Sequence, residues 1–595
     1  MTSPDARFET ALAHQRAGRF AQATALCDAL LAEHPDHLDG LHLRGVLLIQ
    51  AGRHADAIAL LQQVVARAPA LALAHKNLGA AFHAAGRAAE AEPCYRGALA
   101  LAPELAEAHN LLGQLLTETG RPGDAVAHLR AAVRLAPADA EAANNLGNAL
   151  QSLGDLDGAI ASYHAALIAR PAFALAHSNL GSALQRRGAL EAAVANYRAA
   201  LSLAPDSAIA HGNLAGLLGE LGDTDGALAH FQRALALEPA SATIHMSLGS
   251  TLYDLGRLDD AIAAYRSALE LRPDFARARL NLAFALLKTG DFARGWQAYR
   301  ARWDTGELDH LRARLAGPPW RGDDPAGRTI LLYGEQGLGD LIQFCRYAPL
   351  LQARGARVVL LVDGSWQPLR ALLASLAGVA RLADTSAAAA PYDCHASVLD
   401  LPGLLGTTLA SIPAEIPYLA ADPVRRARWR ARLGAPRGLR VGLVWAGGTR
   451  FAKEHLRSPR LAPLLTLLGL PGIEWIALQK GDGRRDLEAC ALPPGVVDLG
   501  PELDDFADTA AVMAELDLVI SSCTAPAHLA GALGRPVWVM LPVMADWRWL
   551  TERADSPWYP TMRLFRQVRC GDWTPVVDQL GAALVAWRDG TRAPA

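Results

Sequence analysis

The chain lacks an excess of charge of either sign and lacks any long apolar run. Its 57 Lys and Arg residues nearly balance 60 Asp and Glu residues, which gives a formal net charge of −3 and a pI near 6.7. Proteins that bind nucleic acids or membrane surfaces through electrostatics usually carry clustered positive charge, so we expect neither partner. No stretch approaches the roughly 18 apolar residues of a membrane-spanning helix, so we expect no membrane span.

The sequence also lacks the spacings that mark disulfide frameworks and metal sites. Its seven cysteines are scattered, and none forms a CxxC or Cys/His pair at zinc-ligand spacing. The opening stretch "MTSPDARFETALAHQRAG" has neither the basic nor the apolar region of a secretion signal. We therefore expect a cytoplasmic protein without metal or cofactor. At 595 residues it should contain several domains.

The first half contains a repeat of 34 residues. Prolines recur at this spacing from Pro35 to Pro273, and glycines recur from Gly18 to Gly290. One unit, "ALAHSNLGSALQRRGALEAAVANYRAALSLAPDS", has two segments with apolar residues at helical spacing, split by a glycine and closed by a proline. This pattern resembles the tetratricopeptide (TPR) repeat. About nine units within residues 1–308 predict an α-solenoid whose stacked helical pairs share a core.

Two polar residue types recur at fixed positions of the repeat. The sixth position holds asparagine in five units, and the fourth holds histidine in five units. These are Asn77, Asn145, Asn179, Asn213 and Asn281, and His75, His109, His177, His211 and His245. An asparagine ladder would clamp an extended polypeptide, since each amide donates and accepts, or it would bridge neighbouring helices. Equivalent histidines on the order of 10 Å apart cannot share a metal, so we expect them to pack between helices.

The second half alternates strands with helices. A Pro/Gly-rich hinge is predicted over residues 309–327, followed by alternating series in residues 328–437 and 438–595. Such alternation predicts two doubly wound parallel sheets, hence an α + α/β chain with Rossmann-like lobes and ligand at the strands' carboxyl ends. The predicted strands are "RTILLY", "ARVVLLVD", "VARLAD", "HASVLD", "LRVGLVWAGG", "IEWIALQKG", "VVDLG", "LDLVISS" and "RPVWVMLP", and "WTPVVDQLGAALVAWRDG" predicts a closing helix.

Several segments of this half resemble one enzyme family. They are "WRGDDPAGRTILLYGEQGLGDLIQFCRYAPLL", "GLVWAGG", "LQKG", "DLVISSCTAPAHLAGALGRPVWVMLP", "DWRWL" and "SPWYPTMRLFRQ". Over roughly residues 318–590 the chain is similar to bacterial TPR-containing glycosyltransferases and to heptosyltransferases of the GT-B fold. The resemblance implies an acceptor-side lobe (328–437), a nucleotide-sugar-side lobe (438–595), and inverting, metal-independent transfer to a protein such as flagellin. A non-catalytic scaffold and a lipopolysaccharide transferase are the alternatives.

The glycine-rich turn "YGEQGLGD" follows the first of these strands. The resemblance implies that Asp340 is the catalytic base that takes a proton from the acceptor hydroxyl. The alternative is a carboxylate that caps a helix start. The glycines fit neither the dinucleotide nor the P-loop fingerprint. We therefore expect Gln336, Gly337 and Gly339 to let an acceptor or diphosphate approach the backbone.

A second candidate site begins at "ISSCTAPAHLAGALG". Ser521, Ser522 and Thr524 precede a helix start whose N–H groups would bind the donor phosphate, unless this is an ordinary capped helix. The resemblance implies that Lys453 faces the leaving phosphate with help from Arg457. The alternative for this pair is two solvated loop charges. We also expect Gln479 and Lys480 beside the nucleotide, and His528 either reaching the donor or packing its helix.

One position departs from the family pattern. Where relatives often carry the triplet "VDT", this chain has Cys523, also a donor-side residue. We hypothesise that the missing carboxylate removes repulsion against an anionic sugar, so that Cys523→Asp would weaken an acidic donor more than a neutral one. The aromatic residues Trp547, Trp549, Trp558 and Tyr559 are expected to pack between the lobes rather than to stack on a ligand.

Overall fold

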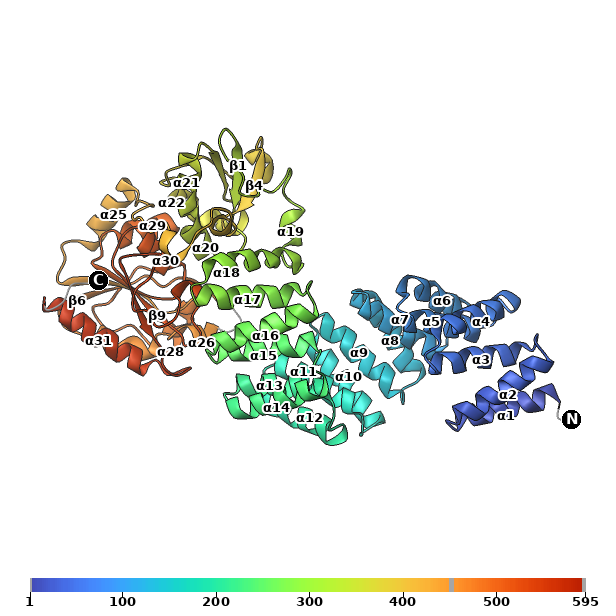
Figure 1. Ribbon diagram of the computed structural model, residues 1–595. Helices are drawn as coiled ribbons and strands as arrows, with labels where there is room; N and C mark the ends of the chain where they lie inside the picture. Colours follow the sequence, from blue (N-terminus) through green and yellow to red (C-terminus); the bar gives the residue numbers. More distant parts are fainter. Residues whose placement is uncertain (1–2, 449–453, 591–595) are drawn as a thin grey trace. The chain divides into compact units, whose positions relative to one another are not determined.

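The computed structural model describes residues 3–448 and 454–590 and divides into two compact units, Met1–Ala240 and Ser241–Ala595 (Figure 1). Lys453 lies outside the described residues. The first unit is built of helical pairs, and the second contains further helical pairs followed by two parallel sheets. A helical repeat array followed by parallel sheet was the architecture expected from the sequence.

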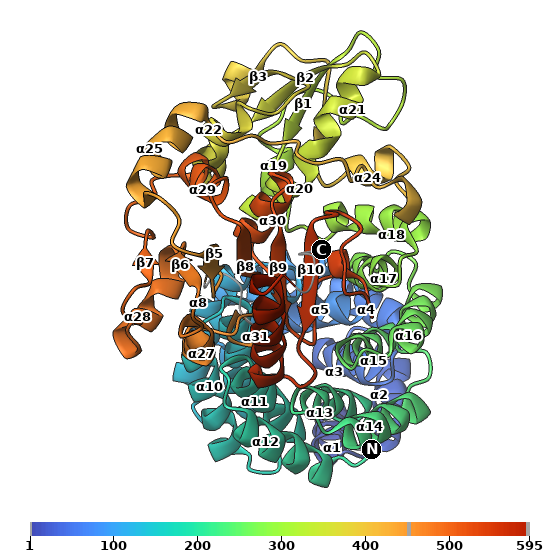
Figure 2. The ribbon, with the colours of Figure 1, turned by 90° about the vertical axis from the view of Figure 1, so that its left-hand side faces the viewer.

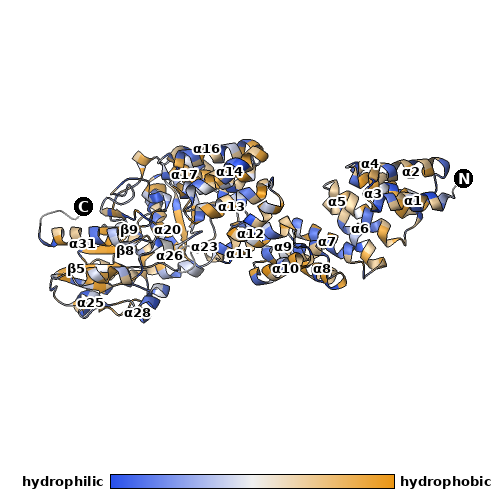
Figure 3. Cartoon of the chain, turned by 90° about the horizontal axis from the view of Figure 1, so that it is seen from below, coloured by the Kyte–Doolittle hydropathy of each residue, from blue (hydrophilic) through white to orange (hydrophobic). Residues whose placement is uncertain are grey.

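The first unit consists of paired helices of 13 or 14 residues. They are α1 (Pro4–Arg16), α2 (Phe20–Glu33), α3 (Leu38–Gln50), α4 (His54–Arg67), α5 (Ala72–Ala84), α6 (Ala88–Leu101), α7 (Ala106–Glu118), α8 (Pro122–Leu135), α9 (Ala140–Ser152), α10 (Leu156–Ala169), α11 (Ala174–Arg186), α12 (Leu190–Leu203), α13 (Ala208–Glu220) and α14 (Thr224–Leu237). In Figure 3 many of these helices contain both apolar residues, in orange, and polar residues, in blue. The predicted helical pairs are therefore confirmed.

Glycines fix both the turns and the spacing of the pairs. The turn glycines from Gly18 to Gly290 all have φ between +71° and +86°, a region that L side chains avoid. A second glycine lies inside the first helix of most pairs and lets the second helix approach closely. A Cβ built on Gly147 would lie 2.4 Å from the ring of Tyr163, whose side chain is fully buried. The two helices of the pair can pack closely because glycine has no side chain at this position.

The second unit begins with the last repeats and not with the sheets. It contains α15 (Ala242–Asp254), α16 (Leu258–Leu271), α17 (Ala276–Lys288), α18 (Phe292–Tyr299) and the 3-10 turn Arg300–Asp304. Trp296 of α18 shares one buried core with the sheets and packs edge-on against Trp547, with 5.2 Å between ring centroids. The end of the array is therefore part of the same folded body as the sheets.

The predicted hinge, residues 309–327, is docked on the first sheet. It contains the short helix α19 (Asp309–Arg312) and then runs beside β4 (Cys394–Ser397). The Trp320 N–H donates to the carbonyl of His395 at 2.8 Å, and the His395 N–H donates to Pro318 at 3.2 Å. Proline and glycine indicated a connection without regular structure, but they did not reveal this pairing.

Within the described residues the first sheet has four parallel strands in the order β3-β2-β1-β4, of which the first three are labelled in Figure 2. The strands are β1 (Thr329–Tyr333), β2 (Arg357–Leu361), β3 (Val379–Ala383) and β4. The accompanying helices are α20 (Leu338–Phe344), α21 (Ala348–Ala353), α22 (Arg370–Leu373), α23 (Ser386–Ala389) and α24 (Leu401–Leu404). The order reverses between β1 and β4, where doubly wound sheets place ligands.

The second sheet has six described parallel strands in the order β10-β9-β8-β5-β6-β7. They are β5 (Leu439–Val444), β6 (Ile473–Ala477), β7 (Val497–Asp498), β8 (Leu518–Ser522), β9 (Val537–Leu541) and β10 (Met562–Arg566). The helices are α25 (Pro423–Leu433), α26 (Glu454–Arg457), α27 (Leu465–Leu468), α28 (Asp486–Ala489), α29 (Phe506–Met513), α30 (Ala525–Ala532) and α31 (Thr574–Arg588). The order reverses between β5 and β8.

No helix among the described residues is long and apolar enough to cross a bilayer.

Candidate functional site

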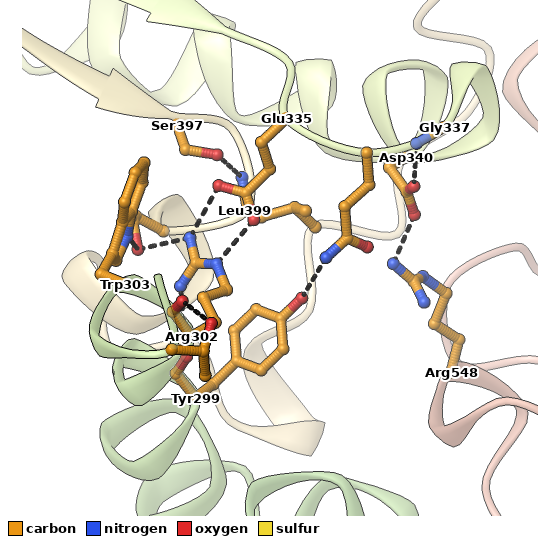
Figure 4. Close-up of polar contacts among 12 residues, drawn as sticks. Tyr299, Arg302, Trp303, Glu335, Gly337, Asp340, Ser397, Leu399 and Arg548 are labelled. Carbon is orange, nitrogen blue, oxygen red and sulfur yellow. Dashed lines mark hydrogen bonds and ion pairs between the residues drawn. The ribbon is translucent and has the colours of Figure 1, made fainter. Parts of the chain in front are cut away.

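Asp340 lies in the first turn of α20, on the loop that leaves β1. The helix begins at Leu338 with Gly337 as its cap residue, so Asp340 is the third helical residue and does not open the helix. Its Oδ2 accepts a hydrogen bond from the Gly337 N–H at 2.7 Å (Figure 4). The alternative interpretation of Asp340 as a capping residue is therefore correct in part, since the carboxylate satisfies one free N–H of the helix start.

The other oxygen of Asp340 pairs with an arginine from the second sheet region. Arg548 donates to Asp340 Oδ1 at 2.5 Å, to Asp546 at 2.8 Å and to the Gln343 side chain at 2.8 Å. Burial lowers the pKa of Arg548, but Asp546 and Asp340 raise it by more, so the guanidinium stays charged. This contact joins the two sheet regions at Asp340.

The two loop glycines differ in their surroundings. A Cβ on Gly339 would lie 3.0 Å from the His528 ring and 3.3 Å from the Ala525 Cα, so this glycine allows α20 to pack on α30. A Cβ on Gly337 would meet only the Asp340 carboxylate, and Gly337 is exposed. Gln336 donates to the Tyr299 hydroxyl at 3.3 Å. Of the expected ligand-facing glycines, Gly337 alone remains open, and Gly339 serves packing.

The segment after β8 brings a helix start close to Asp340. Thr524 is the cap residue of α30, Pro526 lies in the first turn, and no described side chain caps the helix. Ser521 Oγ donates to the carbonyl of Ser522 at 2.8 Å, and Ser522 Oγ is buried without a hydrogen-bond partner among the described residues. Within this turn Pro526 has no N–H and the Ala527 N–H donates to the Thr524 carbonyl at 3.0 Å, so the Ala525 N–H and the helix dipole are what this helix start offers an anion.

Cys523 and His528 point into the second sheet region. The Cys523 thiol is buried and accepts from the Trp549 indole N–H at 2.9 Å, and burial raises its pKa. The His528 ring stacks on Trp549, and its Nδ1 lies 3.1 Å from the Tyr559 hydroxyl. The Cys523 thiol is thus bonded inside the protein, and its position on the donor side stays a prediction. His528 adopts the packing alternative.

Gln479 and Lys480 bind backbone groups. The Gln479 amide oxygen accepts from Trp445 and Ala446, both at 2.9 Å. Its nitrogen donates to the carbonyls of Ala446 and Lys480 at 3.0 and 2.8 Å, so all four bonding positions are used. Lys480 donates to the Leu503 carbonyl. Gln479 therefore fixes the carboxyl ends of β5 and β6 and offers no position to a ligand.

The loop after β5 contacts the start of α30. Gly447 donates to the Glu454 carboxylate at 2.6 Å, and a Cβ on Gly447 would lie 3.0 Å from Thr524. Arg457 donates to the backbone carbonyl of Cys523. Residues from both sides of the strand-order reversal thus meet near Thr524.

The asparagines of the repeats bridge neighbouring helices. Each donates to a polar side chain of the preceding repeat, as the bridging alternative predicts. The pairs are Asn77 with His42 at 2.7 Å, Asn145 with Asn110 at 2.9 Å, Asn179 with Asn144 at 2.9 Å, Asn213 with Ser178 at 3.5 Å and Asn281 with Ser250 at 3.2 Å. These bonds fix one repeat against the next.

The histidines also bond within the array. His109 and His211 lie 3.0 and 3.1 Å from proline carbonyls through Nε2. Their Nδ1 atoms lie 3.0 and 2.8 Å from Nδ1 of His128 and His230. The predicted role in helix packing is confirmed for these residues.

The expected aromatic packing is confirmed as well. Trp547, Trp549, Trp558 and Tyr559 are all buried. Trp558 meets Phe344 of α20 edge-on with 5.5 Å between centroids and stacks on Phe292 of α18 at 6.1 Å. The sequence assigned no role to Arg548, which lies in the segment "DWRWL" between two of these tryptophans. The structure shows Arg548 as the partner of Asp340.

Comparison with known proteins identifies the repeats. Profiles of the tetratricopeptide repeat match residues 8–72, 213–274 and 247–304, and others match 70–138, 172–240 and 147–188. Protein FlbA of Caulobacter vibrioides is 31% identical over 323 residues, 49% of this chain and 52% of FlbA. The chain thus matches about half the length of this curated relative.

The chain is also similar to solved structures, two of which are described as TPR proteins. The Cut9–Hcn1 complex is 19% identical with a TM-score of 0.39, covering 48% of this chain and 55% of its own. TTC0263, a TPR protein of Thermus thermophilus, is 23% identical with a TM-score of 0.28, covering 31% and 100%. YrrB, described as a TPR protein with an unusual peptide-binding site, is 23% identical with a TM-score of 0.27, covering 31% and 95%. The matched family of repeats, and not these structures, indicates a scaffold for protein–protein interaction.

Proposed function

We propose that the chain is a glycosyltransferase that moves a sugar from a nucleotide donor to a polypeptide recruited by its repeats. The two parallel sheets would be the lobes of a GT-B enzyme, with the acceptor beside the first and the donor beside the second. Support comes from the strand order of the second sheet, whose reversal between β5 and β8 is the usual nucleotide position in doubly wound folds.

The observation that carries the proposal is the setting of Asp340. Its carboxylate belongs to the first sheet region, pairs with Arg548 of the second, and lies on the helix whose Gly339 contacts the start of α30. A carboxylate and an uncapped helix start are therefore neighbours at the junction of the two sheet regions. These are the two groups that sugar transfer from a nucleotide requires, a base and a phosphate binder.

In the proposed reaction an oxygen of Asp340 takes the proton of an acceptor hydroxyl. Gly337 and Arg548 each occupy one position on the carboxylate, and each oxygen keeps a second lone pair for that proton. The acceptor oxygen attacks the anomeric carbon while the bond from that carbon to the donor phosphate breaks, and the electron pair leaves with the phosphate. The Ala525 N–H and the dipole of α30, with Arg457 and Lys453, would stabilise the departing charge.

The test is consumption of nucleotide sugars by the purified full chain, with transfer followed by intact mass of co-incubated cellular protein. Asp340→Ala should lower kcat by about 10²–10⁴ while changing the donor KM little, because a general base acts mainly in the transition state. Asp555→Ala is the matched control, since Asp555 is a surface carboxylate paired with Arg553. Equal rates for the wild type and Asp340→Ala would overturn the proposal.

A second candidate is a scaffold that binds a polypeptide without catalysis. It is favoured by Arg548, which pairs with the Asp340 carboxylate, and by Gln479, whose amide bonds only backbone groups. This candidate predicts that the wild type captures a polypeptide but turns over none of the nucleotide sugars offered. Turnover that depends on Asp340 would exclude it.

A further inference from the structure

The loop that carries Asp340 is held by side chains more than by backbone. It leaves β1 after Tyr333 and enters α20 at Leu338. Among the described residues, the backbones of Glu335 and Gln336 form no hydrogen bond with another backbone group. The position of this loop therefore depends on what the side chains of Glu335 and Gln336 contact.

Glu335 is fixed by a buried arginine from the end of the repeats. Arg302 lies in the 3-10 turn that follows α18, and it donates to both oxygens of Glu335, at 2.6 and 3.1 Å (Figure 4). The side chains of Arg302 and Glu335 are 4% and 0% exposed, so the pair is shielded from water. Two parallel N–H donors fix both the distance and the direction of a carboxylate, and Arg302 therefore determines where Glu335 lies.

Arg302 is itself held from several sides. It donates to the Asp400 carboxylate at 2.7 Å and to the Tyr299 carbonyl at 3.3 Å, and its guanidinium lies 4.6 Å from the centroid of the Tyr299 ring. The Trp303 indole N–H also donates to Asp400, at 3.3 Å. Burial lowers the pKa of Arg302, but Asp400 and Glu335 raise it by more, so the guanidinium stays charged. Glu335 thus has a charged partner in a fixed place.

A second contact joins the same two segments. Gln336 donates to the hydroxyl of Tyr299 at 3.3 Å, and Tyr299 belongs to α18 and is 2% exposed (Figure 4). On its other side the loop leads to Asp340, which pairs with Arg548 of the second sheet region. The end of the repeat array and the second sheet region therefore hold this loop between them.

The charge of Glu335 makes the attachment to Arg302 necessary. A buried carboxylate that loses its arginine partner is far less stable than the same carboxylate in water, so the loop would move until Glu335 reaches solvent. Asp340 Oδ2 accepts from the Gly337 N–H of this loop, and a shift of the loop therefore moves the Asp340 carboxylate as well. A displacement of about 1 Å at a reacting group lowers a rate by as much as about 10²-fold.

We propose that Arg302 is a positioning residue for the transfer reaction, because through Glu335 it holds the loop that presents Asp340 to the acceptor hydroxyl. This role rests on the proposed function and deepens it. The end of the repeat array becomes part of the geometry of the reaction and not only a means of recruiting a polypeptide. Arg302 touches no substrate and acts through Glu335 alone.

The first measurement is turnover by the purified full chain with UDP-N-acetylglucosamine, ADP-glucose and CMP-N-acetylneuraminate as donors and cellular protein as acceptor. With a donor that the wild type consumes, Arg302→Gln should lower kcat about 10- to 100-fold and leave the donor KM within about twofold, because the base is displaced while the donor side is not. Arg312→Gln is the matched control and should behave as the wild type, since Arg312 lies in the nearby helix α19 with a side chain 53% exposed.

The second measurement separates positioning from general damage. The double variant Arg302→Gln with Glu335→Gln places two neutral amides at the contact, and amides bond to each other without a buried charge. It should recover kcat to within about fivefold of the wild type, so that the two substitutions compensate rather than add. If Arg302→Gln is poorly folded, Arg302→Lys replaces it. Lysine keeps the charge without the paired donors, and it should still lower kcat with the donor KM unchanged.

Hydrogen exchange of the α20 amides, measured without donor or acceptor, tests the same contact independently of catalysis. Arg302→Gln should speed exchange at residues 338–344, Arg312→Gln should not, and the double variant should restore the wild-type rate. A wild type that consumes none of the donors would overturn the proposed function, whereas exchange would still show whether Arg302 holds the loop. Unchanged exchange in Arg302→Gln, or a double variant that loses more kcat than Arg302→Gln, would refute the positioning role.

Discussion

His528 is held in a buried slot between elements far apart in the sequence. Its ring stacks on Trp549 with 5.4 Å between centroids, and its Nδ1 lies near the Tyr559 hydroxyl. Burial, and then the charges of Arg548, Arg346 and Arg457, lower its pKa well below the usual value. The folded protein therefore keeps this histidine neutral.

The stability of the second unit should consequently fall in mild acid. Unfolded histidine takes up a proton near pH 6.5, whereas folded His528 does not, so the unfolded state binds more protons as the pH drops below that value. His528→Gln should reduce this loss, which is at most about 1.4 kcal/mol per pH unit for one group. The measurement is urea unfolding between pH 7.5 and pH 5 by tryptophan fluorescence.

Tryptophan fluorescence reports the second unit alone, because all 13 tryptophans lie between Trp296 and Trp587. His310→Gln is the control, since His310 is exposed. Parallel pH profiles for wild type and His528→Gln would show that another group causes the acid sensitivity.

The helical pair α9 and α10 shows which contacts hold the two helices of a repeat together and join one repeat to the next. Gly147 allows the buried ring of Tyr163 to rest against α9, and the Tyr163 hydroxyl lies 2.8 Å from the amide oxygens of both Asn148 and Gln151, which share its one proton. Asn179 of the next pair donates to the same Asn148 at 3.1 Å. Packing within a pair and bonding between pairs therefore converge on one residue.

Gly147→Ala should destabilise α9 and α10 by about 1–3 kcal/mol, because the new methyl group has no space beside Tyr163. The gain in helix propensity, about 1 kcal/mol, offsets part of this cost. Hydrogen exchange of the α9 and α10 amides measures the change.

Gly216→Ala provides the matched control for this packing effect. Gly216 lies inside α13, and a Cβ there meets nothing within 4 Å. The substitution should stabilise α13 by about 0.5–1 kcal/mol through propensity alone. Equal effects of the two substitutions would rule out the packing explanation.

The spacing of apolar residues predicted helices and strands well, because it reflects which side chains are buried. The 34-residue spacing predicted the helical pairs, and apolar runs predicted every described strand except β10. That strand, "MRLFR", carries Arg563 and Arg566 at the edge of the sheet, where only one side is paired and apolar runs are interrupted. The docking of residues 318–320 on β4 was also missed, because proline and glycine indicate loops but not what the loops touch.

Side-chain direction was harder to predict than element type. The sequence placed Asp340, Gln479 and Cys523 near strand ends, as found. It did not show that Gln479 bonds the backbone at the end of β5, or that Cys523 meets Trp549. Such partners are fixed by tertiary packing, which local pattern does not encode. Arg548, whose partner Asp340 is 208 residues away, is the clearest case.

The division of the whole molecule places the last repeats with the sheets. Phe292, Trp296 and Tyr299 are buried in the core that also holds Trp547 and Trp558. A boundary at residue 308, where the 34-residue period ends, would cut through this core. The periodicity of a sequence thus marks where a pattern stops, not where a folded body begins.

A fragment of residues 241–595 should therefore fold as a cooperative unit, whereas residues 309–595 should not. Removing α15 to α18 takes away contacts worth about 1.5–3 kcal/mol for each large buried side chain lost. We expect 309–595 to show red-shifted tryptophan emission, to bind a hydrophobic dye and to lose its sharp urea transition. A sharp transition in 309–595 equal to that of 241–595 would show that the sheets do not need the repeats.

The contact of Trp296 with Trp547 has a consequence for folding during synthesis on the ribosome. Roughly 250 residues separate the two, which at about 5–20 residues per second means tens of seconds between their syntheses. Throughout that interval the sheet-facing side of α17 and α18 has emerged without its partner. Nascent chains should therefore recruit chaperones at this stage, and translation pauses beyond residue 300 should increase aggregation more than pauses before residue 240.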